Sequence, residues 1–207
     1  MQDINRVMAD RLRKLQGLRE AGVNPFDNGF VPTRTCAEIL ASAEANPPSD
    51  MASVPEDAPT HRVAGRVMAK NKMGKAMFLR IRDRSVGIGT GGPQTLQIYV
   101  RRDDVGTELF SHLKSLDVGD IAGFEGPVFA TRTGETTLMV RTAQLLTKSL
   151  RPLPDKWHGL TDIDARYRQR YVDLVVNPAV QEVFRVRSRI ISMVRKTLLD
   201  RDYIEVE

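Results

Sequence analysis

Residues 63–100 read VAGRVMAKNKMGKAMFLRIRDRSVGIGTGGPQTLQIYV, and this stretch decides the fold. Successive side chains of a β-strand point to opposite faces, so apolar residues at every second position predict a half-buried strand. Three runs show this alternation, and the side chains predicted to face inward are Val63, Val67, Ala69, Met77, Leu79, Ile81, Leu96, Ile98 and Val100. The stretch therefore predicts a three-stranded meander that turns at Met73–Gly74 and again in the glycine-rich loop 85–95.

The same alternation places basic and aromatic side chains together on the other face of the meander. Between Arg62 and Arg84 there are eight Lys or Arg residues and a single acid, Asp83. The outward set, which we expect to be exposed, comprises the rings of Phe78 and Tyr99 and the cations Arg62, Arg66, Lys70, Arg80 and Arg82. Cations that track phosphates beside a ring that stacks on a base are typical of single-stranded nucleic-acid binding. A solvated charged face with one stray ring is the alternative, since a basic stripe alone does not prove binding.

Bulk composition limits the classes of function that fit. The 207 residues are 41% hydrophobic, which predicts one large or two small domains with a buried core. The formal net charge of +5 fits a polyanionic partner without requiring one. Cys36 is the single cysteine, so an internal disulfide is excluded and a cytoplasmic location is expected. The three histidines are too far apart to suggest a metal site, and no apolar run predicts a membrane span or a signal peptide.

Patterns on either side of residues 63–100 predict the elements that complete the domain. The predicted segments are an amphipathic helix at 4–21, a short helix at 36–45, an irregular connector at 46–60, a helix at 103–116, and strands at 120–130 and 136–146. A turn at Gly134 joins the last two strands. Three strands, a helix and two strands are the element order of the OB-fold, a five-stranded Greek-key barrel that binds oligonucleotides. We therefore expect a mainly β fold with flanking helices, built on a five-stranded OB-fold barrel.

Gly87, Gly89 and Gly92 match the dinucleotide-binding pattern G-x-G-x-x-G, but their context does not fit it. That fingerprint requires a following helix whose N-terminus holds the pyrophosphate. Here Pro93 and a strand pattern follow, so we interpret the glycines as part of a long hairpin loop.

The pattern changes after Lys148, where an extended joint leads into helical segments. The predicted elements are a charged helix at 161–175, a second helix ending near Arg201, and a strand beginning at 203–207. Asn177–Pro178 provides the cap and first-turn pair of the second helix. Because a helix and one strand cannot close a core by themselves, residues 150–207 are predicted to begin a second domain.

Five segments carry a resemblance to a known family: Arg11–Phe26, Val63–Phe78, Leu150–Leu160, Ala165–Leu174 and Phe184–Glu207. The most specific runs within them are RPLPDK and RYRQRYVDL. On these residues the chain resembles the N-terminal part of class II lysyl-tRNA synthetases over nearly its whole length. The last segment is similar to class II motif 1, the helix and strand that build the dimer interface of that family.

The resemblance implies three parts. These are an N-terminal helical extension and linker at 1–60, an anticodon-binding OB-fold domain at 61–149, and the hinge and truncated start of an α+β catalytic domain at 150–207.

The resemblance also implies a site for the anticodon of a tRNA. The implied anticodon-binding residues are Arg66, Lys70, Phe78, Gln97 and Glu135. Phe78 matches the ring that stacks on the central uridine, while Gln97 and Glu135 match residues that reach the edge of that base. The two cations match positions that hold the RNA backbone or a base. Asn71 departs from the family pattern, in which a second cation is expected.

A full-length member of this family would attach lysine to its tRNA using ATP and Mg²⁺. Lysine tRNA and a second copy of the chain are therefore the implied partners, and no membrane is expected. Class II motifs 2 and 3, which hold the triphosphate, lie downstream of residue 207, so this chain is expected to bind no cofactor and to be inactive alone. A stand-alone OB-fold nucleic-acid-binding module is the alternative, and a structural role through the motif 1 helix is a third possibility.

Overall fold

The protein is described by a computed structural model that covers residues 2–86, 95–154 and 160–206. The described chain divides into two compact units. Unit 1 runs to residue 152 and contains the β-sheet, and unit 2 contains the helices that follow it. The predicted glycine-rich hairpin loop, with Gly87, Gly89 and Gly92, lies largely outside the described residues.

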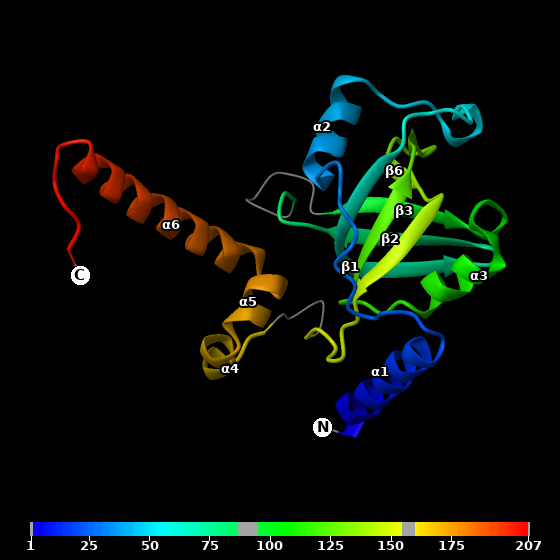
Figure 1. Ribbon diagram of the computed structural model, residues 1–207, viewed down its shortest axis with the longest axis horizontal. Helices are drawn as coiled ribbons and strands as arrows, with labels where there is room; N and C mark the ends of the chain where they lie inside the picture. Colours follow the sequence, from blue (N-terminus) through cyan, green and yellow to red (C-terminus); the bar gives the residue numbers. More distant parts are fainter. Residues whose placement is uncertain (1, 87–94, 155–159, 207) are drawn as a thin grey trace. The chain divides into compact units, whose positions relative to one another are not determined.

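Seven strands form one sheet in unit 1 (Figure 1). They are β1 (His61–Met73), β2 (Ala76–Arg82), β3 (Leu96–Arg101), β4 (Ile121–Gly126), β5 (Val128–Ala130), β6 (Thr136–Met139) and β7 (Thr142–Thr147). Their order across the sheet is β5-β6-β3-β2-β1-β4-β7. The pairings are antiparallel except between β3 and β6, which run parallel. The predicted meander is β1–β2–β3, and Gly74 adopts a φ of 60° at its first turn.

The predicted five-stranded closed barrel is wrong, because the last two predicted strands are each divided. Pro127, which has no N–H to donate, separates β4 from β5, and residues 140–141 separate β6 from β7. The strands β4 to β7 form one hairpin, in which β4 pairs with β1 and β6 pairs with β3. The two edge strands of the open sheet, β5 and β7, therefore both belong to this bent hairpin, which turns at Gly134 with a φ of 79°.

The predicted inward face is confirmed as the core of unit 1. Of its nine residues, all but Ala69 are completely buried. Helix α2 (Cys36–Ala45) adds Cys36 and Ile39 to this core, and helix α3 (Arg102–Ser115) adds Phe110 and Leu113. Each fully buried Leu or Ile contributes about 1.5–3 kcal/mol, so burial of this face is the main source of stability.

Strand β1 contains a register shift that the alternation does not predict. The pairing with β2 slips between Val67 and Ala69, which is the signature of a β-bulge. Beyond the bulge, Lys70 pairs with the inward Leu79 rather than with an outward residue. The predicted placement of Lys70 on the same face as Arg66 is therefore wrong.

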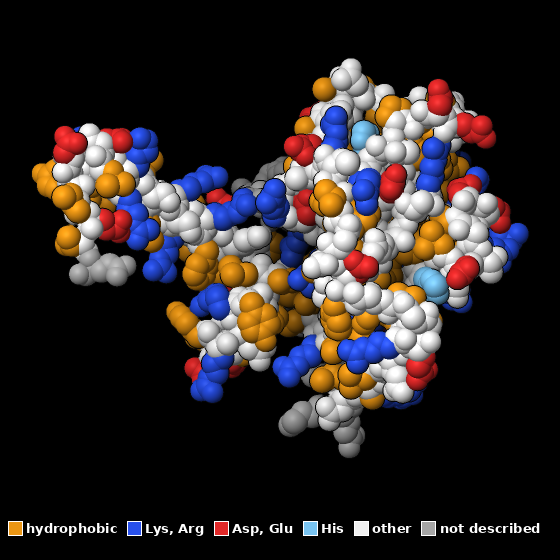
Figure 2. Space-filling view, in the orientation of Figure 1, with side chains coloured by type: hydrophobic (Ala, Val, Ile, Leu, Met, Phe, Trp, Pro, Cys, Tyr) orange, Lys and Arg blue, Asp and Glu red, His pale blue; other side chains and the backbone are white. Residues whose placement is uncertain are grey.

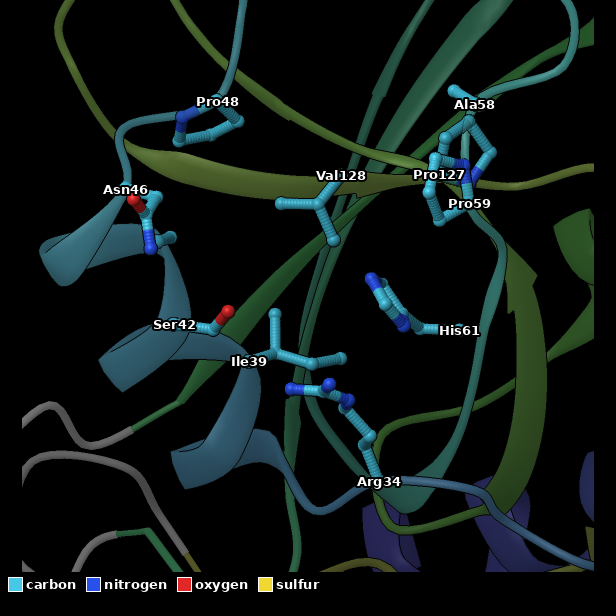
Figure 3. Close-up of a pocket in the computed structure, with 11 residues that line it drawn as sticks. Arg34, Ile39, Ser42, Asn46, Pro48, Ala58, Pro59, His61, Pro127 and Val128 are labelled. Atoms are coloured by element: carbon cyan, nitrogen blue, oxygen red, sulfur yellow. The ribbon is translucent and has the colours of Figure 1, made fainter.

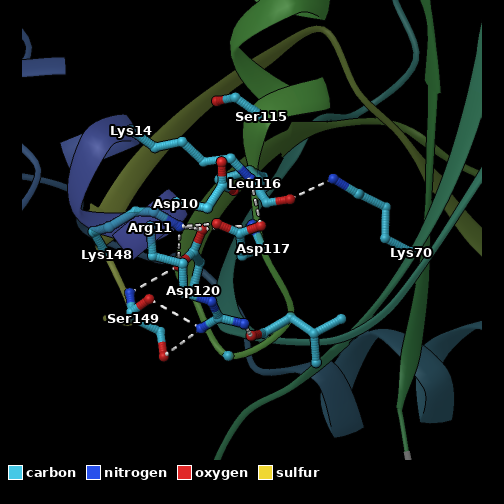
Figure 4. Close-up of polar contacts among 12 residues, drawn as sticks. Asp10, Arg11, Lys14, Lys70, Ser115, Leu116, Asp117, Asp120, Lys148 and Ser149 are labelled. Carbon is cyan, nitrogen blue, oxygen red and sulfur yellow. Dashed lines mark hydrogen bonds and ion pairs between the residues drawn. The ribbon is translucent and has the colours of Figure 1, made fainter. Parts of the chain in front are cut away.

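Helix α1 (Gln2–Glu20) confirms the predicted N-terminal helix and is held by a buried arginine. Arg11 is only 6% exposed, and its guanidinium donates to three carbonyl oxygens. The distances are 2.9 Å to Val118, 3.0 Å to Ser149 and 3.1 Å to Arg151. Figure 4 shows Arg11 next to Ser149. These acceptors belong to the loop before β4 and to the segment after β7, so one side chain joins three parts of unit 1.

A buried ion network lies beside Arg11. Asp120 is 0% exposed and Lys148 is 3% exposed, and the ammonium lies 2.8 Å from the carboxylate. Lys148 and Lys14 also contact opposite oxygens of Asp117, at 2.6 and 2.7 Å. Burial opposes ionisation of Asp117, but the hydrogen bonds and charges of the two lysines outweigh it, and the net pKa of Asp117 is lowered. Asp117 is therefore ionised at neutral pH, and its contacts with Lys14 and Lys148 tie α1 to the sheet.

We predict that Asp120→Ala lowers the free energy of unfolding by about 3–5 kcal/mol, because the buried Lys148 would lose one of its two carboxylate partners and the N–H groups of Asp117 and Ser149 would lose their acceptor. Hydrogen exchange of the slowest amides in β1 and β2 measures this loss. Asp10→Ala is the control, since Asp10 forms only partly exposed ion pairs and should change stability by less than about 1 kcal/mol. Equal effects of the two substitutions would contradict the structural role of the network.

Unit 2 contains helices α4 (Ile163–Arg168), α5 (Arg170–Val176) and α6 (Pro178–Leu199). The single helix predicted at 161–175 is broken at Gln169, whose ψ of 50° is not helical. Residues 203–206 form no strand, because a strand needs a hydrogen-bonded neighbour. The helices carry no stretch that is long and apolar enough to cross a membrane, within the part of the chain that the structure describes.

One buried carboxylate holds the three helices of unit 2 together. Asp173 is 0% exposed and accepts hydrogen bonds from Arg166 at 3.0 Å, from Asn177 at 2.6 Å and from Arg170. Asn177 and Pro178 do begin α6 as predicted, but the Asn177 side chain contacts Asp173 instead of capping the helix. These contacts explain Arg166, Arg170 and Asp173 of the RYRQRYVDL run by packing within unit 2, whereas Tyr167 and Tyr171 of the same run are exposed.

Candidate nucleic-acid interface

The outer face of the sheet carries a cluster of three aromatic rings. Phe78 on β2 pairs with Tyr99 on β3, and their ring centroids lie 4.9 Å apart with a tilt of 43°. Tyr99 also meets Phe129 of β5 edge to face, at 5.9 Å. Tyr99 is only 8% exposed, so its predicted exposure is wrong, while Phe78 is half-buried. Of the three rings, Phe78 therefore offers the most accessible face.

An apolar hollow of about 500 Å³ adjoins this cluster. Met73, Ala76 and the three rings line one side, and the connector before β1 lines another through Met51. The connector contains one helical turn, η1 (Met51–Ser53), and is held to β5 by a hydrogen bond of 2.9 Å from the Ala130 N–H to the Ser49 carbonyl. A hollow of this size and polarity accommodates a flat ring system.

A polar row crosses the strands next to the aromatic cluster. Arg80 lies 2.7 Å from the Glu135 carboxylate and donates to the Gln97 carbonyl oxygen at 3.3 Å. The Gln97 amino group in turn donates to the Thr137 hydroxyl at 2.9 Å. Gln97 is 8% exposed, so this chain of contacts fixes which end of its amide points toward Arg80. Arg80 and Glu135 are partly exposed and present one donor group and one acceptor group to solvent.

The structure thus brings three of the five predicted site residues into one region: Phe78, Gln97 and Glu135. Sequence reasoning missed the organising role of Arg80, which contacts two of them. The alternation did place Arg80 on the face of Phe78, two positions away, and that spacing was the available signal.

Arg66 and Lys70 have internal partners instead. Arg66 pairs with Arg82 on the outer face, yet its guanidinium donates to the Gly119 carbonyl at 2.8 Å. Lys70 donates to the carbonyl of Lys114, at 2.9 Å, and to that of Leu116, at the C-terminal end of α3 (Figure 4). Burial lowers the pKa of Lys70, with Asp117 partly opposing it. Both cations therefore hold the loop between α3 and β4.

Asn71 takes the position across from Phe78. Because of the bulge, Asn71 and not Lys70 pairs with Phe78. Asn71, the residue at which the sequence departs from the pattern expected of the family, is therefore the β1 residue paired with Phe78 of the aromatic cluster.

We predict that Lys70→Met lowers stability by about 1–3 kcal/mol, because the carbonyls at the end of α3 would lose their charged donor. Urea unfolding of the variant measures the change. Lys72→Met is the matched control, since Lys72 is exposed and two residues further along β1, and should leave stability unchanged. Unchanged stability in both variants would contradict the internal role of Lys70.

Two family models match parts of the chain. Residues 61–146 match the OB-fold nucleic acid binding domain of the tRNA anticodon family. Residues 162–207 match the family of tRNA synthetases class II (D, K and N). The first match covers the seven-stranded sheet except for its last residue, Thr147, and the second covers the helices of unit 2.

Curated relatives match the chain over nearly all of its residues. The lysine–tRNA ligase of Anaeromyxobacter dehalogenans (strain 2CP-C) is 50% identical over 97% of this chain and 37% of the relative. The ligase of Pelotomaculum thermopropionicum is 46% identical and that of Carboxydothermus hydrogenoformans 43%, each over 100% of this chain. The chain thus spans only about 37–38% of the length of these relatives.

Proposed function

Because this chain is a relative of the lysine–tRNA ligases and joins an anticodon-binding OB-fold domain to a class II synthetase segment, we propose that it binds the anticodon of lysine tRNA. The observation that carries the proposal is the half-buried ring of Phe78 beside the Arg80–Glu135 pair. An aromatic ring alone stacks on any base, whereas a ring next to a fixed hydrogen-bond donor and acceptor can distinguish one base from another.

Stacking supplies the part of the affinity that does not depend on sequence. The ring of Phe78 is flanked by Tyr99 on the neighbouring strand, which in turn packs on Phe129, so two buried rings support its position. Stacking on such a ring is worth about 1–3 kcal/mol per base. The apolar hollow beside Phe78 extends the surface on which unstacked bases lie.

The polar row supplies base selection in this proposal. A uridine edge offers carbonyl oxygens to the Arg80 guanidinium and an N–H to the Glu135 carboxylate or the Gln97 carbonyl. A cytidine edge offers an amino group and an unprotonated nitrogen instead, which would leave these groups unmatched. The ion pair between Arg80 and Glu135 holds both side chains ready for the base.

We predict that Phe78→Ala weakens binding of a lysine tRNA anticodon stem–loop by about 5- to 150-fold, through loss of stacking. Phe78→Trp should retain most of the affinity, because it keeps a flat ring. Fluorescence anisotropy with a labelled stem–loop measures both. Phe26→Ala is the control, since Phe26 is an exposed ring outside the sheet. Unchanged affinity of Phe78→Ala would remove the stacking role.

We predict that the wild-type chain prefers a central uridine over a central cytidine by about 5- to 150-fold, the range that one matched base edge supplies. Arg80→Met should bring this ratio close to one, because it removes the donor and releases Glu135. Arg101→Met, which breaks the exposed pair with Asp104, is the matched control. Competition with stem–loops that differ at that base measures the ratio, and full selectivity in Arg80→Met would contradict the proposed readout.

Arg66 and Lys70 are part of the proposal in a weaker sense. Their internal contacts hold the α3–β4 loop, and we propose that any effect of these two on RNA affinity follows from that loop. Cations with exposed side chains on the outer side, including Arg132 at the apolar hollow, are the groups that we propose for the RNA backbone. Affinity should therefore fall steeply as salt is raised.

The ligase activity belongs to the proposal for the complete protein. The family implies ATP and Mg²⁺ for lysine attachment. The described residues contain no group of three His, Cys, Asp or Glu side chains that could hold a metal, so we assign no step of that chemistry to this chain. Matches on both sides of residue 150 favour the synthetase interpretation over a stand-alone OB-fold module.

Three further points extend the proposal. We propose the division into 1–60, 61–149 and 150–207 as the domain organisation, and the cytoplasm as the location. A homodimer is proposed for the complete protein, because α6 carries exposed apolar side chains at Val183, Val186, Ile190, Ile191, Met193, Val194, Leu198 and Leu199. Figure 2 shows hydrophobic side chains, in orange, mixed with blue basic and red acidic ones on the visible face of this helix.

A further inference from the structure

The connector of residues 46–60 is attached to the sheet at several points. Its two ends line one small pocket beside the start of β5, where Figure 3 shows Pro48, Pro59, Pro127 and Val128. Between these ends, Ser49 accepts the hydrogen bond from the Ala130 N–H, Asp50 forms a parallel bridge with Ala130, and Arg141 donates to the Glu56 carbonyl at 2.6 Å. The connector is therefore a built part of unit 1, although the OB-fold family match at 61–146 does not include it.

Asp50 places Met51 of the connector at the apolar hollow beside Phe78. The Asp50 carboxylate accepts hydrogen bonds from the N–H groups of Ala52 and Ser53, both at 3.0 Å, and so caps the single turn η1. Met51 is the first residue of that turn; it lines the hollow and stays 41% exposed. A polar cap therefore holds an apolar side chain at a surface where folding alone does not bury it.

The hollow is larger than the surface that one base on Phe78 would cover. Its lining takes residues from β2, β3 and β5, and β5 lies beyond both β3 and β6 in the order of the sheet. Pockets of about 300–1,000 Å³ hold drug-sized molecules, so the 500 Å³ of this hollow leaves room beside a single pyrimidine. Phe129 and Met51 lie in the part of the lining contributed by β5 and the connector.

The lining of the hollow indicates the chemical class of its occupant. Met51 and Met73 supply two thioethers, which adapt in shape and make favourable contacts with aromatic rings. Arg132 supplies an exposed cation, which suits a phosphate. The Asp50 carboxylate is engaged by the N–H groups of its own turn. Flat rings that carry a phosphate match this combination, and the proposed RNA ligand presents them on both sides of its central base.

We propose that Met51 and the connector form a second base site, which takes a base adjacent to the central one in the same RNA strand. This inference rests on the proposed function, because it requires the central base to lie on Phe78. The second base contacts the Met51 thioether, and the mostly apolar lining offers few groups that could select its edge. The second site therefore adds affinity, whereas the Arg80–Glu135 pair supplies the selection of the central base.

The test compares lysine tRNA anticodon stem–loops that are intact or lack one base, either the central base or one of its two neighbours. Met51→Ala should weaken binding of the intact stem–loop by about 2- to 10-fold, the range of one thioether–ring contact. This loss should persist without the central base and vanish when one particular neighbour is missing, and Met51→Ala should leave the preference for uridine over cytidine unchanged. Met193→Ala is the matched control, because Met193 is an exposed methionine on α6.

Two variants of the cap test how Met51 is positioned. Asp50→Ala should reproduce the loss of Met51→Ala, because it releases the turn, whereas Asp50→Asn should keep the affinity, because asparagine caps equally well. The inference is overturned if Met51→Ala binds the intact stem–loop as tightly as the wild type, or if its loss persists when either neighbouring base is missing. A loss in Phe78→Ala without one in Met51→Ala overturns this inference alone, whereas no loss in either variant overturns the proposed stacking as well.

Discussion

The bulge between Val67 and Ala69 is the constraint on which the arrangement of the outer face depends. Strand β1 pairs with β4 along its first half and with β2 along its second half, so it must bend where one partner gives way to the other. A bulge supplies that bend and increases the local twist. It also reverses the side-chain parity beyond Val67, and this turns Lys70 toward α3 and brings Asn71 opposite Phe78.

Charge in this chain has two separate uses. Many of its cations are structural: Arg11, Lys14, Arg66, Lys70 and Lys148 all hold the loop that follows α3 or the segments beside it. Arg80 lies in a different setting, where the acid that it contacts, Glu135, is partly exposed at the same surface. A count of basic residues in sequence therefore overstates the number available to a nucleic acid. The contacts that each cation makes within the protein decide whether that cation can bind a nucleic acid.

The sequence was sufficient to predict the features that depend on alternation and on local turn chemistry. Eight of nine inward residues are completely buried, and Gly74 and Gly134 adopt the positive φ values that their turns need. The bulge was not predictable, because one extra residue in β1 leaves no distinct pattern. The burial of Tyr99 depends on Phe129, which is distant in sequence. The break at Pro127 was readable, since proline does not donate within a strand. The roles of Phe78, Gln97 and Glu135 came from family resemblance, while Arg80 needed the geometry of the folded sheet.

The central claim is that a base stacks on Phe78, on the outer face of the sheet. Nuclear Overhauser effects in a complex of this chain with a lysine tRNA anticodon stem–loop test it most directly. The account predicts contacts between the Phe78 ring protons and the central base of the anticodon, together with contacts from the same base to Arg80 or Glu135. Anticodon contacts to other surfaces, with no contact at the Phe78 ring, would contradict it.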